Sequence, residues 1–323
     1  MVDVEQDKTP IEVSFIIPHK GREDLLQQTI ESLVAQDFPE EQLEIIVVTQ
    51  NQGMNLTSLP SHVNISLIVR DPSDTISTLR NEGVAHSRGV YIAFIDADVA
   101  LAENWVSAML DELESVKTRV LCSAVQKCTA NAAVLEKIRT SLSNAVVDSA
   151  VRFLPGRNLL IRRSTFDQVG GFPEHLVTCE DYYFTDKVHE HGDLYYSSKS
   201  SYIHLGEDKV YREMFSKEIW RGQSNLQSIK GRKIPFSEIP SFLVPVWILI
   251  FFLMFIVFLL GGFFVLSGLA LWLMLLPIMI YSLRLYRIAK GEVSFFSVLK
   301  FYALYFPARI IGTVSGLFKT IRV

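Results

Sequence analysis

The chain has 323 residues, a formal net charge of -4 and 20% charged residues. This balance gives no bulk positive charge, so it argues against a nucleic-acid partner. Its cysteines, Cys122, Cys128 and Cys179, are odd in number and lack metal-type spacing, which predicts free thiols in a reducing compartment.

The first 240 residues read as an α/β domain. Residues 1–10 are polar and acidic, without the apolar core of a cleavable signal. An apolar run at 13–17 closes at Pro18 and leads into helical spacing, which predicts a strand, a loop and a helix. Runs at 43–48 and 65–69 predict two further strands, buried and parallel.

A predicted strand at 90–95 ends in two carboxylates, Asp96 and Asp98. Because residues i and i+2 of an extended chain point to the same side, both carboxylates are expected beyond the carboxyl end of that strand, where open α/β sheets bind ligands. A divalent cation bridging to phosphate would neutralise them. The alternative is a turn in which Asp accepts from loop amides before the helix predicted at 104–116.

Arg80 and Asn81 lie on a helix predicted at 75–88, which leads into the acidic strand. Beside a metal and a phosphate, an arginine offers a fork of donors to phosphate oxygens. The alternative is a solvated helix face.

The chain then predicts a strand at 120–125, a helix at 132–147, a strand from 158 and a helix from 178 to about 191. Glu180 and Asp181 begin that last helix. A carboxylate fixed beside the reacting carbon can take a proton from a hydroxyl, which makes this pair a candidate general base. The alternative is a capping box between Thr178 and Asp181, which needs no catalysis.

Two later positions carry candidate ligands. His204, at the end of a strand-like stretch at 202–206, is either a third metal ligand or a satisfied, partly buried side chain. Trp220 and Arg221 lie on a helix predicted at 208–229. They either stack on a sugar or base and hold pyrophosphate, or pack the domain onto a membrane stem.

The carboxyl-terminal part is apolar, and residues 242–281 contain no charged side chain. Residues 242–260 and 263–281 are each long enough to cross a bilayer, and Gly261-Gly262 allows a reversal between them. Residues 293–318 are also apolar but contain Lys300 and Arg309, which suit a helix lying in the membrane interface.

Basic residues flank the predicted hairpin on its outer ends only. They are Lys230, Arg232 and Lys233 before it, and Arg284, Arg287 and Lys290 after it. This pattern predicts a multi-pass protein of the cytoplasmic (inner) membrane with its α/β domain facing the cytoplasm. The expected organisation is a tail at 1–10, an α/β domain at 11–230, a linker at 231–241, two spanning helices within 242–281 and an interfacial amphipathic helix at 293–318.

From residue 12 to about 227 the sequence resembles glycosyltransferase family 2, whose members have the GT-A fold. The resemblance rests on several segments in the order of the family. They are Val-Ser-Phe-Ile-Ile-Pro at 13–18, Arg-Asn-Glu-Gly at 80–83, Ala-Phe-Ile-Asp-Ala-Asp at 93–98, residues 158–163, Gly-Gly-Phe at 170–172 and Glu-Asp at 180–181. It implies a nucleotide-binding α/β domain with a mixed, mostly parallel sheet flanked by helices.

The resemblance also implies roles for individual residues. Mg²⁺ or Mn²⁺ would bind at Asp98, with Asp96 near the ribose or the metal and His204 as a ligand or phosphate contact. Asp181, with Glu180 beside it, would deprotonate the acceptor. The remaining substrate-binding candidates are Pro18, Arg80, Asn81, Asn158, Gly171, Trp220 and Arg221.

Two departures from the family pattern bear on the substrate. Thr-Gln-Asn-Gln-Gly at 49–53 replaces the common Asp-Asp-Gly-Ser, which leaves the donor nucleotide open. Trp-Arg-Gly at 220–222 replaces the Gln-x-x-Arg-Trp of processive synthases and favours transfer of one sugar. The expected activity is an inverting, metal-dependent transfer from a nucleotide-sugar to a lipid-linked or glycan acceptor in surface polysaccharide or glycolipid synthesis. The alternatives are a polyprenyl-phosphate glycosyltransferase and a non-catalytic sugar-nucleotide-binding scaffold.

Overall fold

The computed structural model describes residues 10–54, 64–223 and 239–321, with side chains up to residue 316. These residues form two compact units. The first holds the described residues up to Lys127 together with Val146–Gly206, and the second holds Cys128–Ala145 together with the described residues from Glu207 onward. Residues 1–9 of the predicted tail, and the predicted linker up to residue 238, lie outside the described residues.

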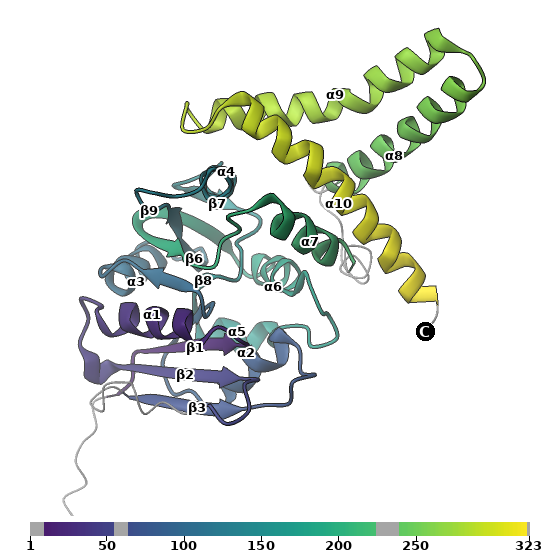
Figure 1. The fold of residues 1–323 in the computed structure, drawn as a ribbon. Helices are drawn as coiled ribbons and strands as arrows, with labels where there is room; N and C mark the ends of the chain where they lie inside the picture. The colour runs from purple at the N-terminus through teal and green to yellow at the C-terminus, as the bar shows by residue number, and fades with distance from the viewer. Residues whose placement is uncertain (1–9, 55–63, 224–238, 322–323) are drawn as a thin grey trace, which may run out of the picture. The chain divides into compact units, whose positions relative to one another are not determined.

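The first unit is built on one mixed sheet (Figure 1). Its parallel half contains β1 (Val13–His19), β2 (Leu43–Thr49), β3 (Ile65–Val69) and β4 (Tyr91–Ile95), in the order β3-β2-β1-β4. These are the four strands that the apolar runs predict, and they are confirmed.

The other half of the sheet mixes strand directions. Its strands are β5 (Val99–Leu101), β6 (Arg119–Lys127), β7 (Ser149–Val151), β8 (Asn158–Arg162) and β9 (Asp193–His204). β8 runs antiparallel between β4 and β6, whereas β9 runs parallel to β6. The mixed α/β sheet expected from the sequence is thus confirmed.

Helices cover both faces of this sheet because side chains of a strand alternate between faces. Phe15 and Ile17 face a core with α1 (Glu23–Val34) and α3 (Trp105–Ser115). Ile16, between them, faces a second core. The helices of that second core are α2 (Ile76–Ala85), α5 (Arg163–Val169) and α6 (Glu180–His189).

A wide bulge divides β9 into two halves. Its pairing with β6 jumps from Ser197 to Ser201, so three residues loop out of the ladder. Beyond the bulge, β9 turns to pair antiparallel with the short strand β5, which places His204 opposite Val99. The stretch predicted at 202–206 is therefore the end of a longer strand, and β5 was not predicted.

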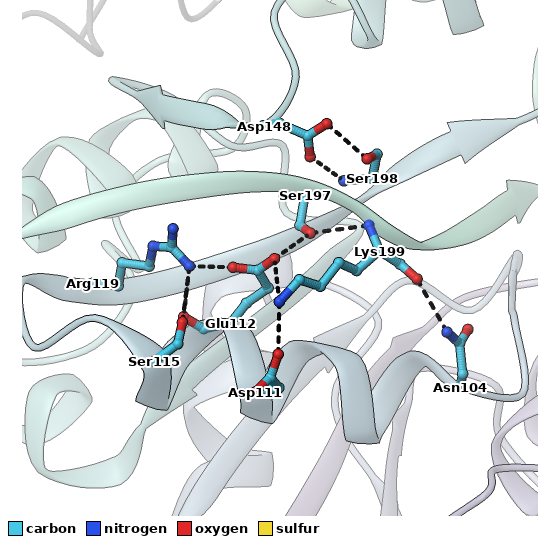
Figure 2. Close-up of polar contacts among 9 residues, drawn as sticks. All are labelled: Asn104, Asp111, Glu112, Ser115, Arg119, Asp148, Ser197, Ser198 and Lys199. Atoms are coloured by element: carbon cyan, nitrogen blue, oxygen red, sulfur yellow. Dashed lines mark hydrogen bonds and ion pairs between the residues drawn. The ribbon is translucent and has the colours of Figure 1, made fainter.

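Polar side chains hold the bulge in place (Figure 2). The buried Glu112 carboxylate accepts a hydrogen bond from Ser197 Oγ at 3.0 Å and pairs with Arg119 and with Lys199, whose Nζ lies 3.2 Å away. Asp148 accepts from the Ser198 amide at 2.8 Å. These hydrogen bonds and ion pairs fix the bulge, and the part of β9 that follows it pairs with β5.

The second unit is helical. Its helices are α4 (Val134–Ser143), α7 (Tyr211–Gly222), α8 (Ile239–Leu260), α9 (Phe264–Ile288) and α10 (Phe295–Ile321). α4 is shorter than the helix predicted at 132–147 and ends at its C-cap, Asn144. Residues 149–151 form β7, which pairs with β9 in the first unit. Residues 224–229 of the predicted α7 helix lie outside the described residues.

α8 and α9 form the predicted hairpin, joined at Gly262, whose φ of +76° suits glycine. α9 runs seven residues beyond the predicted end at residue 281, to Ile288. Among the described residues, three helices are long and apolar enough to cross a membrane: Ile239–Leu260, Phe264–Ile288 and Phe295–Gly316.

α10 packs along α7 rather than standing apart. A Cβ on Gly312 would overlap the Ile219 carbonyl and lie 2.9 Å from the Gly222 Cα, so the two backbones touch. Beside this contact, Glu218 is 1% exposed and pairs with Arg139, Arg221 and Arg309. Burial opposes ionisation, but these three guanidinium groups lower the pKa of Glu218 to about 2.

Candidate active site

Asp96 and Asp98 lie at the carboxyl edge of the parallel strands. They follow β4 directly, beside the ends of β1 and β2 at His19 and Thr49. This placement agrees with the expectation that both carboxylates point past the strand. Their side chains nevertheless have different partners.

Asp98 is held between two basic groups. Arg22 places a guanidinium nitrogen 2.6 Å from Asp98 Oδ2, and His204 Nε2 lies 3.4 Å from Oδ1. Burial raises the pKa of Asp98, yet His204 and Arg22 together lower it to about 2. The structure thus brings together two of the three predicted metal ligands, Asp98 and His204.

Gly206 leaves the space that Asp98 and Arg22 occupy. A Cβ at this position would overlap Asp98 Oδ2 and lie 2.7 Å from a terminal nitrogen of Arg22. Any larger residue would displace one of these two side chains. Gly206 is therefore part of the site, although the sequence reading did not single it out.

Asp96 points to Arg80 instead. Arg80 is 2% exposed and donates to Asp96 Oδ1 at 3.0 Å and to Glu180 Oε1 at 2.8 Å. Burial and the neighbouring Asp98 raise the pKa of Asp96 against the opposing charge of Arg80. The solvated-helix alternative for Arg80 is wrong, because the side chain crosses the interior and ties two acidic segments together.

Asp181 lies next to this bridge, in the first turn of α6. The helix has Cys179 at its N-cap, in the left-handed region with φ +65°, and no side chain caps it. The capping-box alternative between Thr178 and Asp181 is therefore wrong. Asp181 instead accepts from the amides of Tyr182 at 2.8 Å and Gly156 at 3.4 Å.

The environment of Asp181 makes it a weaker acid than usual. Burial and the adjacent Glu180 charge raise its pKa to about 6, and Arg80 opposes the shift only in part. The side chain keeps partial exposure, so a substrate can reach it. A partly exposed carboxylate with a pKa near neutrality suits proton abstraction.

Asn81 and Gly171 meet beside this carboxylate cluster. The Asn81 amide accepts from the Phe172 amide at 2.9 Å and donates to its carbonyl at 3.0 Å. Gly171 has φ +84°, and a Cβ there would lie 2.8 Å from Asn81 Oδ1. The pair fixes the turn before α6.

The other predicted substrate residues have different surroundings. Asn158 is fully buried and accepts from Trp105 Nε1 and the Ala124 amide, so it joins β8 to α3 and β6. Pro18 lies within β1, opposite Val48. Trp220 and Arg221 belong to α7 in the second unit, where Trp220 is half-exposed and Arg221 pairs with Glu218 at 2.5 Å.

A loop that the sequence reading treated only as a turn supplies Arg22. Asn51, at the unusual segment after β2, accepts from the Gly21 amide at 2.8 Å and donates to the Gly21 carbonyl at 2.8 Å. The one available signal was position: a charged loop that follows β1 must lie at the same edge as Asp98.

Residues 14–171 match the family model described as Glycosyl transferase family 2. The chain carries a glycosyltransferase family 2 domain. Family 2 enzymes are inverting transferases that use nucleotide-sugars, so residues 14–171 form a domain of the nucleotide-sugar glycosyltransferase type.

Curated relatives agree with this family. Glycosyltransferase AglE of Haloferax volcanii is 21% identical over 75% of this chain and 81% of its own length. Poly(ribitol-phosphate) beta-glucosyltransferase of Bacillus spizizenii is 25% identical over 54% of this chain, which covers only 29% of that longer protein.

Solved structures show the same fold. Mannosyltransferase PcManGT of Pyrobaculum calidifontis, in complex with GDP-Man and Mn²⁺, matches with a TM-score of 0.62 at 16% identity, over 95% of this chain and 90% of the other. S. aureus TarS 1–349 in complex with UDP matches with a TM-score of 0.50 at 15% identity, over 93% and 90%. The predicted GT-A class, a mixed sheet followed by long apolar helices, is confirmed.

The family 2 domain offers some, but not all, of the ligands that a divalent cation needs. Within the described residues, no group of three or more His, Cys, Asp or Glu side chains is arranged to hold a metal, since Asp96 turns to Arg80. Asp98 and His204 do face each other. One or two protein ligands suffice for Mg²⁺ when substrate phosphates and water complete the shell, so the residues fit.

The raised pKa of Asp181 predicts how this glycosyltransferase responds to pH. A base works only when deprotonated, so kcat/KM should fall about tenfold per pH unit below about pH 6 and level off above it. Rate profiles with saturating cation would measure this. A profile that stays flat from pH 5 to 8 would exclude Asp181 as the titrating base.

Proposed function

We propose that this chain is a metal-dependent, inverting glycosyltransferase that moves one sugar from a nucleotide-sugar to a lipid-linked or glycan acceptor. The observation that carries the proposal is the buried Arg80, which joins Asp96 to Glu180 and leaves Asp181 beside them. One arginine thereby connects the donor edge of the sheet to the first turn of α6, which carries the proposed base. A silent scaffold has no need for a base with a raised pKa.

In this mechanism Asp181 takes the proton of the acceptor hydroxyl. The hydroxyl oxygen attacks the anomeric carbon from the face opposite the nucleotide, and the bond from that carbon to the diphosphate oxygen breaks. The amides of Gly156 and Tyr182 hold the Asp181 carboxylate in place. One displacement inverts the anomeric configuration without a covalent enzyme intermediate.

Other charged residues of the chain would help the nucleoside diphosphate to leave. Mg²⁺ or Mn²⁺, when bound, would neutralise charge on the leaving nucleoside diphosphate. Asp98 and His204 would hold the cation, and Arg80 keeps Asp96 and Glu180 from repelling each other. Asn81 and Gly171 shape the turn next to the base.

The identity of the donor nucleotide is best tested with several classes of nucleotide-sugar. One similar structure was solved with GDP-Man and another with UDP, and the usual acidic segment after β2 reads Thr-Gln-Asn here. The purified chain should therefore be screened with UDP-, GDP- and dTDP-sugars. We expect one class to raise the melting temperature in the presence of Mn²⁺ and to be hydrolysed slowly. A donor that raises the melting temperature but is never hydrolysed would instead favour the non-catalytic sugar-nucleotide-binding scaffold.

The apolar helices support an acceptor that is presented at a membrane. We propose that α8 and α9 span the cytoplasmic membrane, that α10 lies at its interface, and that the acceptor is presented there during surface polysaccharide or glycolipid synthesis. α10 satisfies the length of a span, but its contacts support the interface. Its Arg309 pairs with Glu218 at 2.9 Å, and its Lys300 lies 4.3 Å from the Tyr211 ring centroid. One face of α10 therefore packs on the charged helix α7 and not on lipid.

This topology predicts a labelling pattern in intact cells. With the native cysteines replaced by serine, Arg322→Cys should resist a membrane-impermeant maleimide, because the carboxyl end stays on the cytoplasmic side. A cysteine at position 262 would be strained, because Gly262 has a φ of +76°. Gly261→Cys, in the hairpin turn, therefore serves as the exposed control and should react. Labelling of position 322 from outside would instead make α10 a third span.

A further inference from the structure

Arg22 lies closer to the Asp98 carboxylate than His204 does. Its guanidinium lies 2.6 Å from Asp98 Oδ2, while the side chain itself is 57% exposed. His204 faces the other oxygen, so both oxygens of the carboxylate already have a basic neighbour. A divalent cation that binds Asp98 must therefore compete with a resident positive charge.

The loop that carries Arg22 is built to hold it there. Asn51 Nδ2 donates to the Gly21 carbonyl and, at 2.9 Å, to Glu23 Oε1, on either side of Arg22. Gly21 has φ +86°, which glycine adopts without strain. Asn51 stands in the segment that departs from the common acidic pattern, so this departure has a role in positioning the loop.

The space beside Asp98 is limited. Gly206 lies against both the carboxylate and the Arg22 guanidinium, and even a Cβ would not fit there. The exposed side of Arg22 is the direction in which it can move. A cation approaching Oδ2 thus displaces Arg22 outward and leaves a guanidinium without its anionic partner.

Resting on the proposed function, we propose that Arg22 is an internal counter-ion of Asp98 that couples cation binding to donor binding. Without a nucleotide, the cation has to displace Arg22 and binds weakly. With a nucleoside diphosphate present, the displaced guanidinium gains phosphate oxygens as new partners, so the displacement is easier. Arg22 is a positioning residue, which keeps the cation from binding before the donor.

The test measures Mn²⁺ binding to the detergent-solubilised full chain through loss of the free-ion EPR signal, first with Mn²⁺ alone. Arg22→Gln should bind Mn²⁺ at least about tenfold more tightly than wild type, because the competing charge is gone. Asn51→Ala, which loosens the loop but keeps the arginine, should give a smaller gain. Addition of UDP or GDP, whichever the donor screen selects, should strengthen Mn²⁺ binding more in wild type than in Arg22→Gln.

Arg88→Gln is the matched control. Arg88 is also an exposed arginine and pairs with a buried carboxylate, Glu44 at 2.9 Å, near the start of β2. Its loss should leave Mn²⁺ affinity unchanged. An equal gain in Arg88→Gln would reduce the effect to general charge and overturn the inference.

Asp98→Asn distinguishes a failure of the counter-ion inference from a failure of the metal assignment. If it abolishes Mn²⁺ binding while Arg22→Gln binds like wild type, the counter-ion inference fails and the metal assignment stands. If Asp98→Asn binds Mn²⁺ as wild type does, the metal assignment in the proposed function fails, and the inference fails with it.

Discussion

Asp181→Asn should reduce sugar transfer by at least about a hundredfold while leaving donor and cation binding nearly intact. The base acts on the acceptor hydroxyl and not on the nucleotide, so only the chemical step is lost. An asparagine oxygen in the place of Oδ1 can still accept from the Tyr182 amide, and only the longer bond of 3.4 Å from the Gly156 amide to Oδ2 is lost. Single-turnover transfer and donor titration would separate rate from binding.

Asp186→Asn is the control, since it makes the same change later on α6. It should keep wild-type turnover. If Asp181→Asn retains more than about a tenth of wild-type turnover, Asp181 is not the base. A variant with unchanged donor binding and melting temperature but no transfer would be the expected phenotype.

Removal of divalent cations should abolish transfer, and Mn²⁺ or Mg²⁺ should restore it. The two arginines that contact the carboxylates of the site, Arg22 and Arg80, already have acidic partners. The charge of the leaving diphosphate therefore needs the cation. Asp98→Ala should be equally inactive and should not recover at high Mn²⁺.

His204→Ala tests the second of the two proposed metal ligands. As a ligand, His204 should raise the Mn²⁺ concentration needed for half-maximal activity, whereas a purely structural histidine would lower the melting temperature alone. Full activity of the wild type in excess EDTA would remove the metal from the mechanism.

The edge strand β3 is partly exposed, although it was predicted to be buried. The parallel half of the sheet was nevertheless predictable because its inner strands, including β1 and β2, are buried on both faces. Such strands are continuous apolar runs, and β1, β2 and β3 coincide with the runs almost residue for residue. The second half was harder. β5 has three residues, and the bulge in β9 is serine-rich, so neither has the apolar periodicity that marks a strand.

The site was only partly predictable for a different reason. The acidic pair, Asp181 and His204 could be proposed from their positions at strand ends and a helix start. The partners of Arg80 could not, because Asp96 and Glu180 lie 16 and 100 residues away and only the fold brings them together. The capping-box alternative failed because Cys179 adopts a left-handed conformation that no local pattern reveals.

The glycine contact between α7 and α10 has a consequence for the order in which the protein is made. Gly222 cannot meet Gly312 until the ribosome has passed both apolar helices, α8 and α9. At about 5–20 residues per second, that interval lasts several seconds. During it, the α7 surface around Ile219 and Glu218 has no covering helix. The nascent enzyme therefore completes α7 packing only after its membrane segment has been synthesised, so translation that stops after α9 should leave this helix accessible to protease.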